Sequence, residues 1–323
     1  MDTKQAGEKI FSRDNILILC HQNPDGDTLG SGFALLYALW NAGKAARLEC
    51  SDPVPKSFAF LAPGREMPRF EPEFIVAVDI ADPQLFGKGL EHYRDRVDLC
   101  IDHHPSNTHY AAHTCLDAGA GATAEVILQL LRDAGQPVTG EIANCVYTGL
   151  CTDTGCFRYS NVTPRTLRMA ADMLEAGADA AGINRRMFET KSRSRIAIEK
   201  DVLNTVRYYF DGRCALIYIT REMLAATGAD ETELDGVSAL PRQIEGVEAG
   251  VTLREKEGGF KVSLRTAEYL DASLLCGRMG GGGHARAAGC FLEGPLEQCI
   301  ARVVKEVGEA LDARDEAAEK GTL

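Results

Sequence analysis

The sequence predicts an α/β protein whose N-terminal half forms a parallel sheet with helices on both faces. Short apolar runs such as Ile16–Cys20 and Phe74–Val78 have the length and composition of buried parallel strands. Segments with the length of helices separate these runs, as in repeated βαβ units. With 323 residues the chain is long enough for two ordinary domains, and we expect a smaller C-terminal α/β domain with a mixed sheet.

The composition is that of a globular protein, with 45% hydrophobic and 25% charged residues. No apolar run reaches the roughly 18 residues of a membrane-spanning helix. The polar segment from Met1 to Arg13 resembles neither a signal peptide nor a transit peptide, so we expect a cytoplasmic protein without membrane contacts. The formal net charge of −12 argues against binding of long DNA, because such binding depends largely on phosphate neutralisation. The 11 cysteines include no CxxC pair, so we expect reduced, mostly buried thiols and no thiolate zinc site.

The first strand, Ile16–Cys20, leads into a polar loop and then a helix that includes Phe33 to Trp40. The loop carries one imidazole and two carboxylates: His21, Asp25 and Asp27. Capping a helix needs only one such polar group, so this spacing favours a binding site. Gly30 and Ser31 keep the beginning of the helix small, and we expect this to let a phosphate approach.

Two further strands also end on polar side chains. A strand is expected at Arg47–Cys50, and the next one, Phe74–Val78, ends on Asp79. The apolar run from Val97 to Ile101 predicts another strand. We place three polar residues on the loop that leaves it: Asp102, His103 and His104. Carboxylates and imidazoles at strand ends are typical of metal sites and of proton transfer.

The helices that follow bring one more carboxylate. We expect helices at Ala124–Ala134, at Glu141–Leu150 and at Thr163–Ala176. The glycines of residues 119–121 before the first of them are equally typical of a hinge, a phosphate-binding loop or a simple turn. The second helix leads into a loop of small residues that carries Asp153.

The carboxyl ends of parallel strands lie at one edge of a sheet, so these polar side chains are expected to converge there. So many acidic groups would repel each other unless cations compensate their charge. Hard divalent ions with mixed carboxylate and imidazole ligands fit this requirement, and the mixture suits Mn²⁺.

The second half begins after a polar, charged connector. We expect strands at Cys214–Thr220, Val247–Arg254 and Phe260–Thr266, the last two paired around a glycine turn. A short helix from Asp271 to Cys276 and a glycine-rich loop over residues 277–283 follow. Pro295–Ala310 closes the domain as a helix, and we expect the residues after Asp312 to fray.

Five blocks of the sequence match a known family. Four resemble, in order and intact, the motifs of the DHH phosphoesterase superfamily: His21-x-x-Pro24-Asp25-x-Asp27-x-x-Gly30-Ser31, Val78-Asp79, Asp102-His103-His104 and Thr152-Asp153-Thr154-Gly155. The fifth, Gly280 to Gly289 with His284 and Arg286, resembles the signature of the DHH-associated C-terminal domain. The resemblance covers nearly the whole chain. It implies a DHH catalytic domain over residues 1–181, a helical linker over 182–205 and a DHH-associated substrate-binding domain over 206–323.

The resemblance also implies a phosphohydrolase with two Mn²⁺ ions, for which Mg²⁺ or Co²⁺ could substitute, in a cleft between the two domains. His21 and Asp25 would hold one ion, and Asp79 would bridge the two. The second ion would have three further ligands: Asp27, His103 and Asp153. His104 would face the substrate phosphate and assist proton transfer, while Asp102 either joins the site or only orients a neighbouring histidine.

The C-terminal domain would supply the substrate contacts. Arg265 and Thr266 resemble the family's Arg-Ser pair, and an arginine suits a terminal phosphate because it can donate two parallel hydrogen bonds. The remaining contacts would come from the glycine-rich block: Gly281, Gly282, Gly283, His284 and Arg286.

Among the activities of the superfamily, we favour that of the bifunctional oligoribonuclease and pAp phosphatase (nanoRNase) group. We expect no further nucleic-acid-binding domain and no membrane or sensory region, which argues against a processive exonuclease and a membrane-bound cyclic-dinucleotide enzyme. The expected substrates are short RNA, linear dinucleotides such as pApA, and 3′-phosphoadenosine 5′-phosphate (pAp). A soluble cyclic di-AMP phosphodiesterase is the alternative enzyme, and a metal-free DHH-like binding scaffold is the alternative outside catalysis. A homodimer is compatible with this interpretation.

Overall fold

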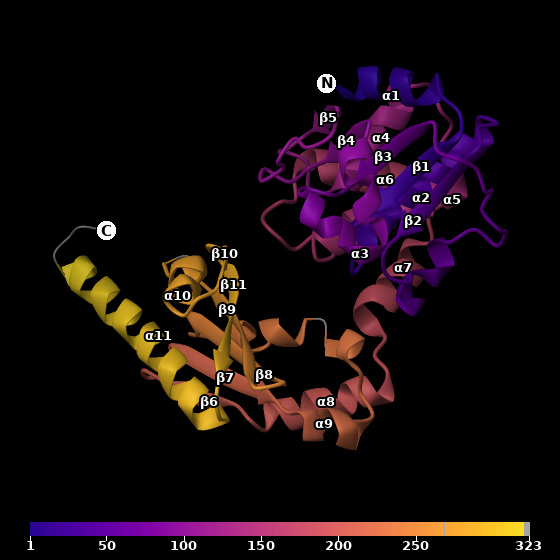
Figure 1. Cartoon of the computed structure of the whole chain (residues 1–323). Coiled ribbons are helices and arrows are strands. Elements are labelled where there is room, and N and C mark those ends of the chain that lie inside the picture. Colours follow the sequence, from indigo (N-terminus) through magenta and orange to yellow (C-terminus); the bar gives the residue numbers. More distant parts are fainter. Residues whose placement is uncertain (235, 268, 320–323) are drawn as a thin grey trace. The chain divides into compact units, whose positions relative to one another are not determined.

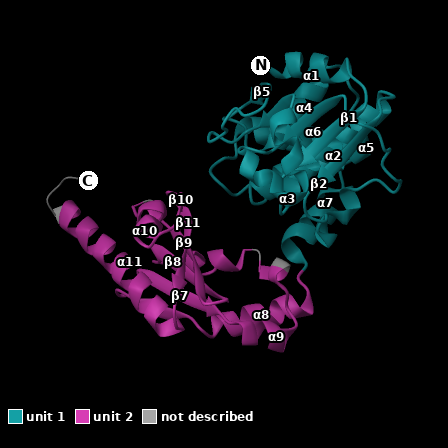
Figure 2. Ribbon diagram, viewed as in Figure 1, with its two compact units in different colours: residues 1–190 teal, residues 191–323 magenta. Residues whose placement is uncertain are grey.

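The computed structural model describes residues 1–234, 236–267 and 269–319. The chain divides into two compact units, residues 1–190 and 191–323 (Figure 2). Each unit has its own sheet and its own hydrophobic core. Within the described ranges, no helix combines the length and the apolar character that are needed to cross a bilayer.

The sheet of the first unit has five parallel strands in the order β2-β1-β3-β4-β5 (Figure 1). The strands are β1 (Ile16–Cys20), β2 (Ala46–Cys50), β3 (Phe74–Val78), β4 (Leu99–Asp102) and β5 (His113–Leu116). From β1 the chain moves outward to β2 and then returns to β3 on the other side, so the strand order reverses between β1 and β3. Sheets of this kind bind ligands at the carboxyl ends of the strands, at such a switch point.

Helices cover both faces of this sheet, as the sequence predicted. The longer helices are α1 (Thr3–Phe11), α2 (Gly26–Asn41), α4 (Thr123–Asp133), α5 (Gly140–Asp153) and α6 (Pro164–Glu175). The short ones are η1 (Lys56–Leu61), η2 (Pro83–Phe86), α3 (Gly87–Leu90), η3 (Glu91–Arg96), α7 (Ala180–Asn184) and the π-helix η4 (Arg185–Glu189). Strand side chains alternate between the faces. Ile18 and Val76 belong to the core with α2, α4 and α5, whereas Leu17 and Ile75 pack with Phe86 and the other short-helix side chains.

The second unit contains a mixed sheet of six strands in the order β10-β11-β9-β8-β7-β6. Its strands are β6 (Arg207–Tyr209), β7 (Cys214–Ile219), β8 (Ala249–Lys256), β9 (Gly259–Thr266), β10 (Gly282–His284) and β11 (Ala287–Glu293). Only the pair β7–β8 is parallel among these described strands. The helices are α8 (Arg193–Leu203), α9 (Arg221–Thr227), η5 (Glu231–Leu234), η6 (Val237–Ala239), η7 (Pro241–Gln243), α10 (Ala272–Arg278) and α11 (Leu296–Glu319). The core with α10 and α11 lies on one face, and the core with α8 and η6 lies on the other.

Several elements differ from the sequence expectations. Strand β4 begins at Leu99 because the Asp98 carboxylate accepts a hydrogen bond from the Ile75 amide at 2.8 Å. The strand also includes Asp102, which was expected on the loop after it. Helix α1 and strands β5, β6 and β10 were not anticipated. Strand β10 uses Gly282 and Gly283, which were expected in a loop.

The C-terminal helix is longer than predicted. Helix α11 continues to Glu319, so the expectation of fraying after Asp312 was wrong over the described residues, and residues 320–323 lie outside them. Ion pairs account for the difference. The Arg314 guanidinium donates to the Glu248 carboxylate at 2.6 Å, and Arg213 pairs with Asp315 at 2.6 Å.

Gly30 has a packing role. A Cβ atom at this position would overlap the carbonyl oxygen of Cys145, because α2 and α5 cross here with their backbones in close approach. The small residue that we expected to admit a phosphate is therefore required by helix packing. Ser31 contacts the functional region instead, since its hydroxyl donates to the Asp27 carboxylate at 3.2 Å.

Candidate metal centre

The six predicted ligand side chains come together at the carboxyl edge of the first sheet. Their ligand atoms form two groups whose members lie within 4.8 Å of one another: His21, Asp25 and Asp79, and Asp27, His103 and Asp153. Asp79 belongs as well to a third group, with His103 and His104. The carboxylate of Asp79 thus lies between the two predicted sets of ligands, at the β1–β3 switch point.

His21 leaves the end of β1 with its ring fixed in one orientation. Its Nδ1 lies 2.8 Å from the carbonyl oxygen of Gln22, and its Nε2 lies 3.6 Å from both Asp25 Oδ1 and Asp79 Oδ2. Burial opposes a charge on this imidazole, but the two carboxylates outweigh burial and raise the pKa of His21 to about 11. The carboxylates therefore attract positive charge to this point, which a proton or a metal ion can supply. A backbone carbonyl on the other ring nitrogen is the usual support of a metal-binding histidine.

His103 shows most directly that a ligand fits. Its Nδ1 lies 3.1 Å from the carbonyl oxygen of Ala120, which leaves Nε2 pointing at three carboxylates. Nε2 is 3.5 Å from Asp153 and 3.9 Å from both Asp27 and Asp79. This nitrogen is buried and has no hydrogen-bond partner among the described residues. An unpaired buried polar atom is costly, whereas the lone pair of a neutral imidazole beside carboxylates is a good ligand for a divalent cation.

Asp27 is held by the first turn of α4. Its carboxylate accepts hydrogen bonds from the amides of Thr123 at 2.6 Å and Ala124 at 3.0 Å. Burial, followed by repulsion from Asp79 and the other carboxylates, nevertheless raises the pKa of Asp27 well above its ordinary value. Burial is also the main cause that raises the pKa of Asp153 to about 6. Cations bound in this region would remove that repulsion.

Asp79 adopts an unusual backbone conformation. Its φ of +62° lies in the left-handed region, where aspartate is better tolerated than most residues but still uncommon. Its amide donates to the carbonyl of Ile101 at 2.9 Å, and its carboxylate accepts a 2.7 Å hydrogen bond from the Thr123 hydroxyl. These contacts fix the carboxylate between the two ligand groups.

Asp102 supports His104 and does not face the two groups. One carboxylate oxygen accepts hydrogen bonds from His104 Nδ1 at 2.8 Å and from the amides of His103 and His104. The other oxygen accepts from the side-chain nitrogen of Asn107 at 2.6 Å. The hydrogen bond with Asp102 is the main reason that the pKa of His104 is raised to about 9. His104 is thereby kept protonated at neutral pH, with its side chain 43% exposed at the site.

The predicted substrate residues of the second unit lie around β9, β10 and β11. The Thr266 hydroxyl donates to the Leu270 carbonyl at 2.7 Å, and the Arg286 guanidinium donates to the carbonyls of Ala267 and Leu270. These two side chains therefore hold the segment after β9. Gly281 and Gly283 allow close backbone packing against β11, because a Cβ atom on either would overlap that strand. Gly282 and His284 are exposed on β10, and Arg265 lies in β9 opposite Ala287.

Each of the two units matches the model of a known protein family. The family model described as "DHH family, N-terminal domain" matches residues 15–150, and the model described as "DHHA1 domain" matches residues 216–313. A Thermus thermophilus protein named "Bifunctional oligoribonuclease and PAP phosphatase NrnA" is 35% identical over 303 residues, which cover 92% of this chain and 90% of that protein. The chain belongs to the DHH family. The resemblance inferred from the motifs is confirmed.

Solved structures support the DHH fold. An exopolyphosphatase-related protein from Bacteroides fragilis has a TM-score of 0.83 at 25% identity, with 96% of each chain covered. RecJ from Thermus thermophilus in complex with Mn²⁺ has a TM-score of 0.56 at 14% identity, with 95% of this chain and 54% of RecJ covered. The second likeness concerns the fold alone.

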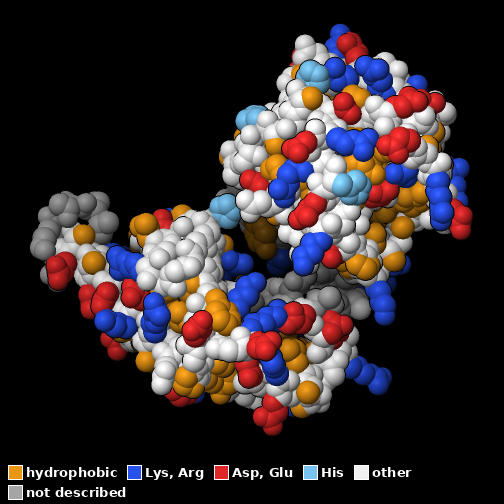
Figure 3. Space-filling view, viewed as in Figure 1, with side chains coloured by type: hydrophobic (Ala, Val, Ile, Leu, Met, Phe, Trp, Pro, Cys, Tyr) orange, Lys and Arg blue, Asp and Glu red, His pale blue; other side chains and the backbone are white. Residues whose placement is uncertain are grey.

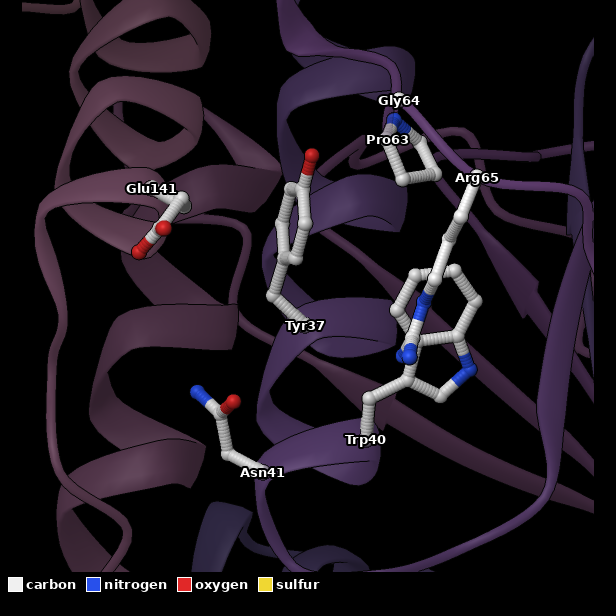
Figure 4. A pocket seen from close by; sticks show the side chains of 7 residues that line it. All are labelled: Tyr37, Trp40, Asn41, Pro63, Gly64, Arg65 and Glu141. Carbon is white, nitrogen blue, oxygen red and sulfur yellow. The ribbon is translucent and has the colours of Figure 1, made fainter.

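A separate pocket lies at the far end of α2 (Figure 4). Its lining residues are Tyr37, Trp40, Asn41, Pro63, Gly64, Arg65 and Glu141. At ~1.5 Å per helical residue, Trp40 lies about 20 Å along the helix from the DHH site residue Asp27. The Tyr37 hydroxyl and the Trp40 indole N–H both donate to backbone carbonyls, and the Arg65 guanidinium lies 3.8 Å from the centre of the Trp40 ring. These contacts anchor the neighbouring segments, and the pocket contains no residue of the DHH motifs.

The sequence reasoning missed two residues of the DHH site. Thr123 contacts both Asp27 and Asp79, and Asn107 supports Asp102. A signal for Thr123 was available, because it begins a helix directly after a glycine-rich segment. No local pattern marks Asn107, whose role depends on the path of the loop after β4.

Proposed function

We propose that this protein is a manganese-dependent phosphohydrolase that cleaves short oligoribonucleotides or linear dinucleotides such as pApA to mononucleotides and dephosphorylates pAp. The observation that carries the proposal is the pair of ligand groups, with Asp79 of the first group lying 3.9 Å from His103 of the second. The buried Nε2 of His103 is unpaired among the described residues. The substrate class comes from the Thermus thermophilus relative, whose name gives oligoribonuclease and PAP phosphatase activities.

We assign the residues as the two groups suggest. His21 and Asp25 would hold one cation, Asp79 would be shared, and the other cation would have three further ligands: Asp27, His103 and Asp153. Mixed nitrogen and oxygen ligands suit Mn²⁺, with Mg²⁺ or Co²⁺ as substitutes. Two such cations supply Lewis-acid activation of a phosphoryl group and of the attacking water.

His104 provides positive charge and a proton at the site. Its Nδ1–H is committed to Asp102, so the proton on Nε2 is the one available to a phosphoryl oxygen or a leaving group. Because the pKa of His104 is raised to about 9 by the hydrogen bond with Asp102, this proton is present at neutral pH. Asp102 and Asn107 keep the ring in this orientation.

The second unit is proposed to bind the substrate. Arg265 would pair with a terminal phosphate, and His284 would contact a phosphate or a base from the exposed strand β10, together with the backbone of Gly281, Gly282 and Gly283. Thr266 and Arg286 would act by shaping the segment after β9, consistent with their hydrogen bonds to its carbonyls. We keep residues 1–181, 182–205 and 206–323 as the proposed catalytic domain, linker and substrate-binding domain.

We further propose that long DNA is not a substrate. The net charge is −12, and Figure 3 shows acidic side chains interspersed with basic ones on the visible face of each unit. Binding of long nucleic acid requires many cationic side chains that are not already paired with acidic ones. We therefore expect the affinity for short substrates to come from the proposed metal and substrate-binding residues. A homodimer remains part of this proposal, to be measured by analytical ultracentrifugation.

A parallel substrate assay tests the proposed function. The purified protein with Mn²⁺ is offered pAp, pApA, a short RNA, cyclic di-AMP and pyrophosphate, with a chelated sample as the control. We expect mononucleotides from pApA and RNA, phosphate from pAp, and loss of all turnover on chelation. Hydrolysis of pyrophosphate with the nucleotides untouched would refute the proposal, and preferential hydrolysis of cyclic di-AMP would change the substrate class.

A further inference from the structure

Glu125 is a buried carboxylate close to the proposed metal centre, and the motifs do not include it. It lies in the first turn of α4, and its side chain is fully buried. One oxygen accepts hydrogen bonds from the Gly121 amide at 3.0 Å and the Thr166 hydroxyl at 2.5 Å. The other oxygen accepts from the Arg165 guanidinium at 2.7 Å. Burying a charge is costly, and three donors arranged around one carboxylate indicate a specific structural purpose.

The backbone around the Gly121 amide contacts one proposed ligand directly and a second one through Asn161. The carbonyl of Ala120, one residue before the bonded Gly121 amide, lies 3.1 Å from His103 Nδ1. The carbonyl of Gly121 accepts a 2.9 Å hydrogen bond from the Asn161 side chain. The same Asn161 nitrogen donates to the main-chain carbonyl of Asp153 at 3.2 Å. Glu125 is thus connected to His103 through the Ala120–Gly121 peptide group, and to the main chain of Asp153 through Gly121 and the Asn161 side chain.

This peptide has little freedom to move. A Cβ atom on Gly121 would lie 2.9 Å from the Glu125 carboxylate, 3.0 Å from the Asn161 carbonyl and 3.1 Å from the Thr166 hydroxyl. Only glycine fits between these groups. The orientation of the Ala120 carbonyl, and with it the ring of His103, therefore depends on the acceptor that Glu125 provides.

The hydrogen bonds of Glu125 itself lead to one of the two ligand groups. The first turn of α4 also holds Asp27 through the amides of Thr123 and Ala124. All three members of the Asp27, His103 and Asp153 group are therefore linked to Glu125 or its helical turn. In the other group, His21 rests on the Gln22 carbonyl and Asp25 accepts from amides at the start of α2. Of its three members only Asp79 contacts the first turn of α4 in the described part of the chain, through the Thr123 hydroxyl.

We infer that Glu125 is a positioning residue that sets the cation affinity of the Asp27, His103 and Asp153 group through the Gly121 peptide. This inference rests on the proposed function, because it concerns one of the two proposed cation sites. Residues that orient metal-binding histidines typically change metal affinity by about 10–100-fold when they are replaced. We expect a loss of that size at one site only.

Two substitutions of Glu125 separate positioning from simple stability. Glu125→Met keeps the length of the side chain but removes every acceptor, whereas Glu125→Gln keeps one oxygen that can still accept from Gly121 and Thr166. Glu141→Gln is the matched control, because Glu141 is also in the first turn of its helix but is exposed. Each protein is titrated with Mn²⁺ and followed by electron paramagnetic resonance, with thermal unfolding measured in parallel.

We expect wild type and E141Q to bind two Mn²⁺ ions with the spectrum of a coupled pair. E125M should bind one ion at nearly wild-type affinity and the second about 10–100-fold more weakly. At Mn²⁺ concentrations that fill only the first site, its spectrum should be that of an isolated ion. E125Q should recover most of the second affinity. Asn161→Ala, which removes a partly exposed side chain, should also weaken only one site, and it keeps the test valid if E125M does not fold.

Distinct outcomes refute the two levels of the argument. Wild-type protein that binds no Mn²⁺ would refute the proposed function. Wild-type protein with two coupled ions, together with folded E125M or N161A that also binds two at unchanged affinity, would refute only the role of Glu125. Equal weakening of both sites in proportion to lost thermal stability would likewise show that Glu125 is merely structural.

Discussion

The hydroxyl of Thr123 should determine how well Asp79 serves both ligand groups. Thr123→Val replaces the hydroxyl by a methyl group of similar size and removes the 2.7 Å hydrogen bond to Asp79. The helix and the Thr123 amide that holds Asp27 remain, so the variant should fold. The change therefore isolates one interaction of the shared carboxylate.

The magnitude follows from the charge of the acceptor. A hydrogen bond to a charged group contributes about 1.5–3 kcal/mol in proteins. At ~1.4 kcal/mol per factor of ten, its loss corresponds to about 10-fold to 150-fold in an equilibrium or rate constant. Since Asp79 is shared, we expect Mn²⁺ affinity at both sites to fall, and turnover of pAp to fall by about the same factor at limiting Mn²⁺.

A second buried threonine provides the control. Thr148 is fully buried in α5, and its hydroxyl donates to the carbonyl of Asn144 at 2.8 Å. Thr148→Val should leave Mn²⁺ affinity and turnover unchanged. A loss of affinity or turnover that is the same in both variants would come from replacing a buried threonine by valine, and not from the contact with Asp79. Wild-type Mn²⁺ affinity and wild-type turnover in T123V would refute the assignment of Asp79 as a shared ligand that Thr123 orients.

Three other predictions follow from the same region. Asp79→Asn should abolish binding of the coupled Mn²⁺ pair, as seen by electron paramagnetic resonance, and reduce pAp turnover, as measured by phosphate release, by at least about 100-fold. Normal turnover would contradict the assignment of Asp79 as a ligand of both cations. Asp102→Asn should lower the pKa of His104 from about 9, because the hydrogen bond that raises it would then be made to a neutral oxygen and not to a carboxylate. His104 is charged below its pKa, so any contribution of that charge to activity disappears as the pH rises through about 9 in wild type and at a lower pH in D102N. Proton NMR titration of the metal-free protein measures the pKa of His104 in both proteins. Equal pKa values would show that Asp102 does not raise the pKa of His104. Gly30→Ala should destabilise the first unit by about 1–3 kcal/mol because the added methyl group overpacks the contact of α2 with α5. Gly140→Ala, where a Cβ meets no atom within 4 Å, should be nearly neutral in the same denaturant titration.

Local patterns were sufficient for the strands that are buried and apolar. Ile16–Cys20 and Phe74–Val78 were predicted with their observed bounds, because a short uninterrupted apolar run between polar segments is typical of a buried parallel strand. Strands β5 and β10 could not be found in this way. The first begins with exposed His113 and the second contains two exposed glycines, so only pairing with a neighbouring strand identifies them.

The candidate ligands were predictable because short motifs carry them, but their supports were not. In the sequence, Glu125 is an ordinary acidic residue in a first helical turn. Its burial depends on Arg165 and Thr166, which follow about two helices later in the chain. In the same way, the charged end of α11 suggested fraying, whereas its ion pairs with Glu248 and Arg213 hold it in the helix. Contacts between segments that are distant in the sequence decide such cases, and the local pattern of apolar and polar residues does not reveal these contacts.

The spacing of the ligands along the chain has a kinetic consequence. His21 follows the first strand, whereas Asp153 ends a helix that comes after all five strands of the sheet. The two ligand groups therefore cannot assemble until the first unit has nearly completed its fold, and an unfolded chain offers them no preformed arrangement. Manganese should accordingly slow the unfolding of this unit while leaving its refolding rate almost unchanged, because interactions absent from the folding transition state act on the unfolding rate.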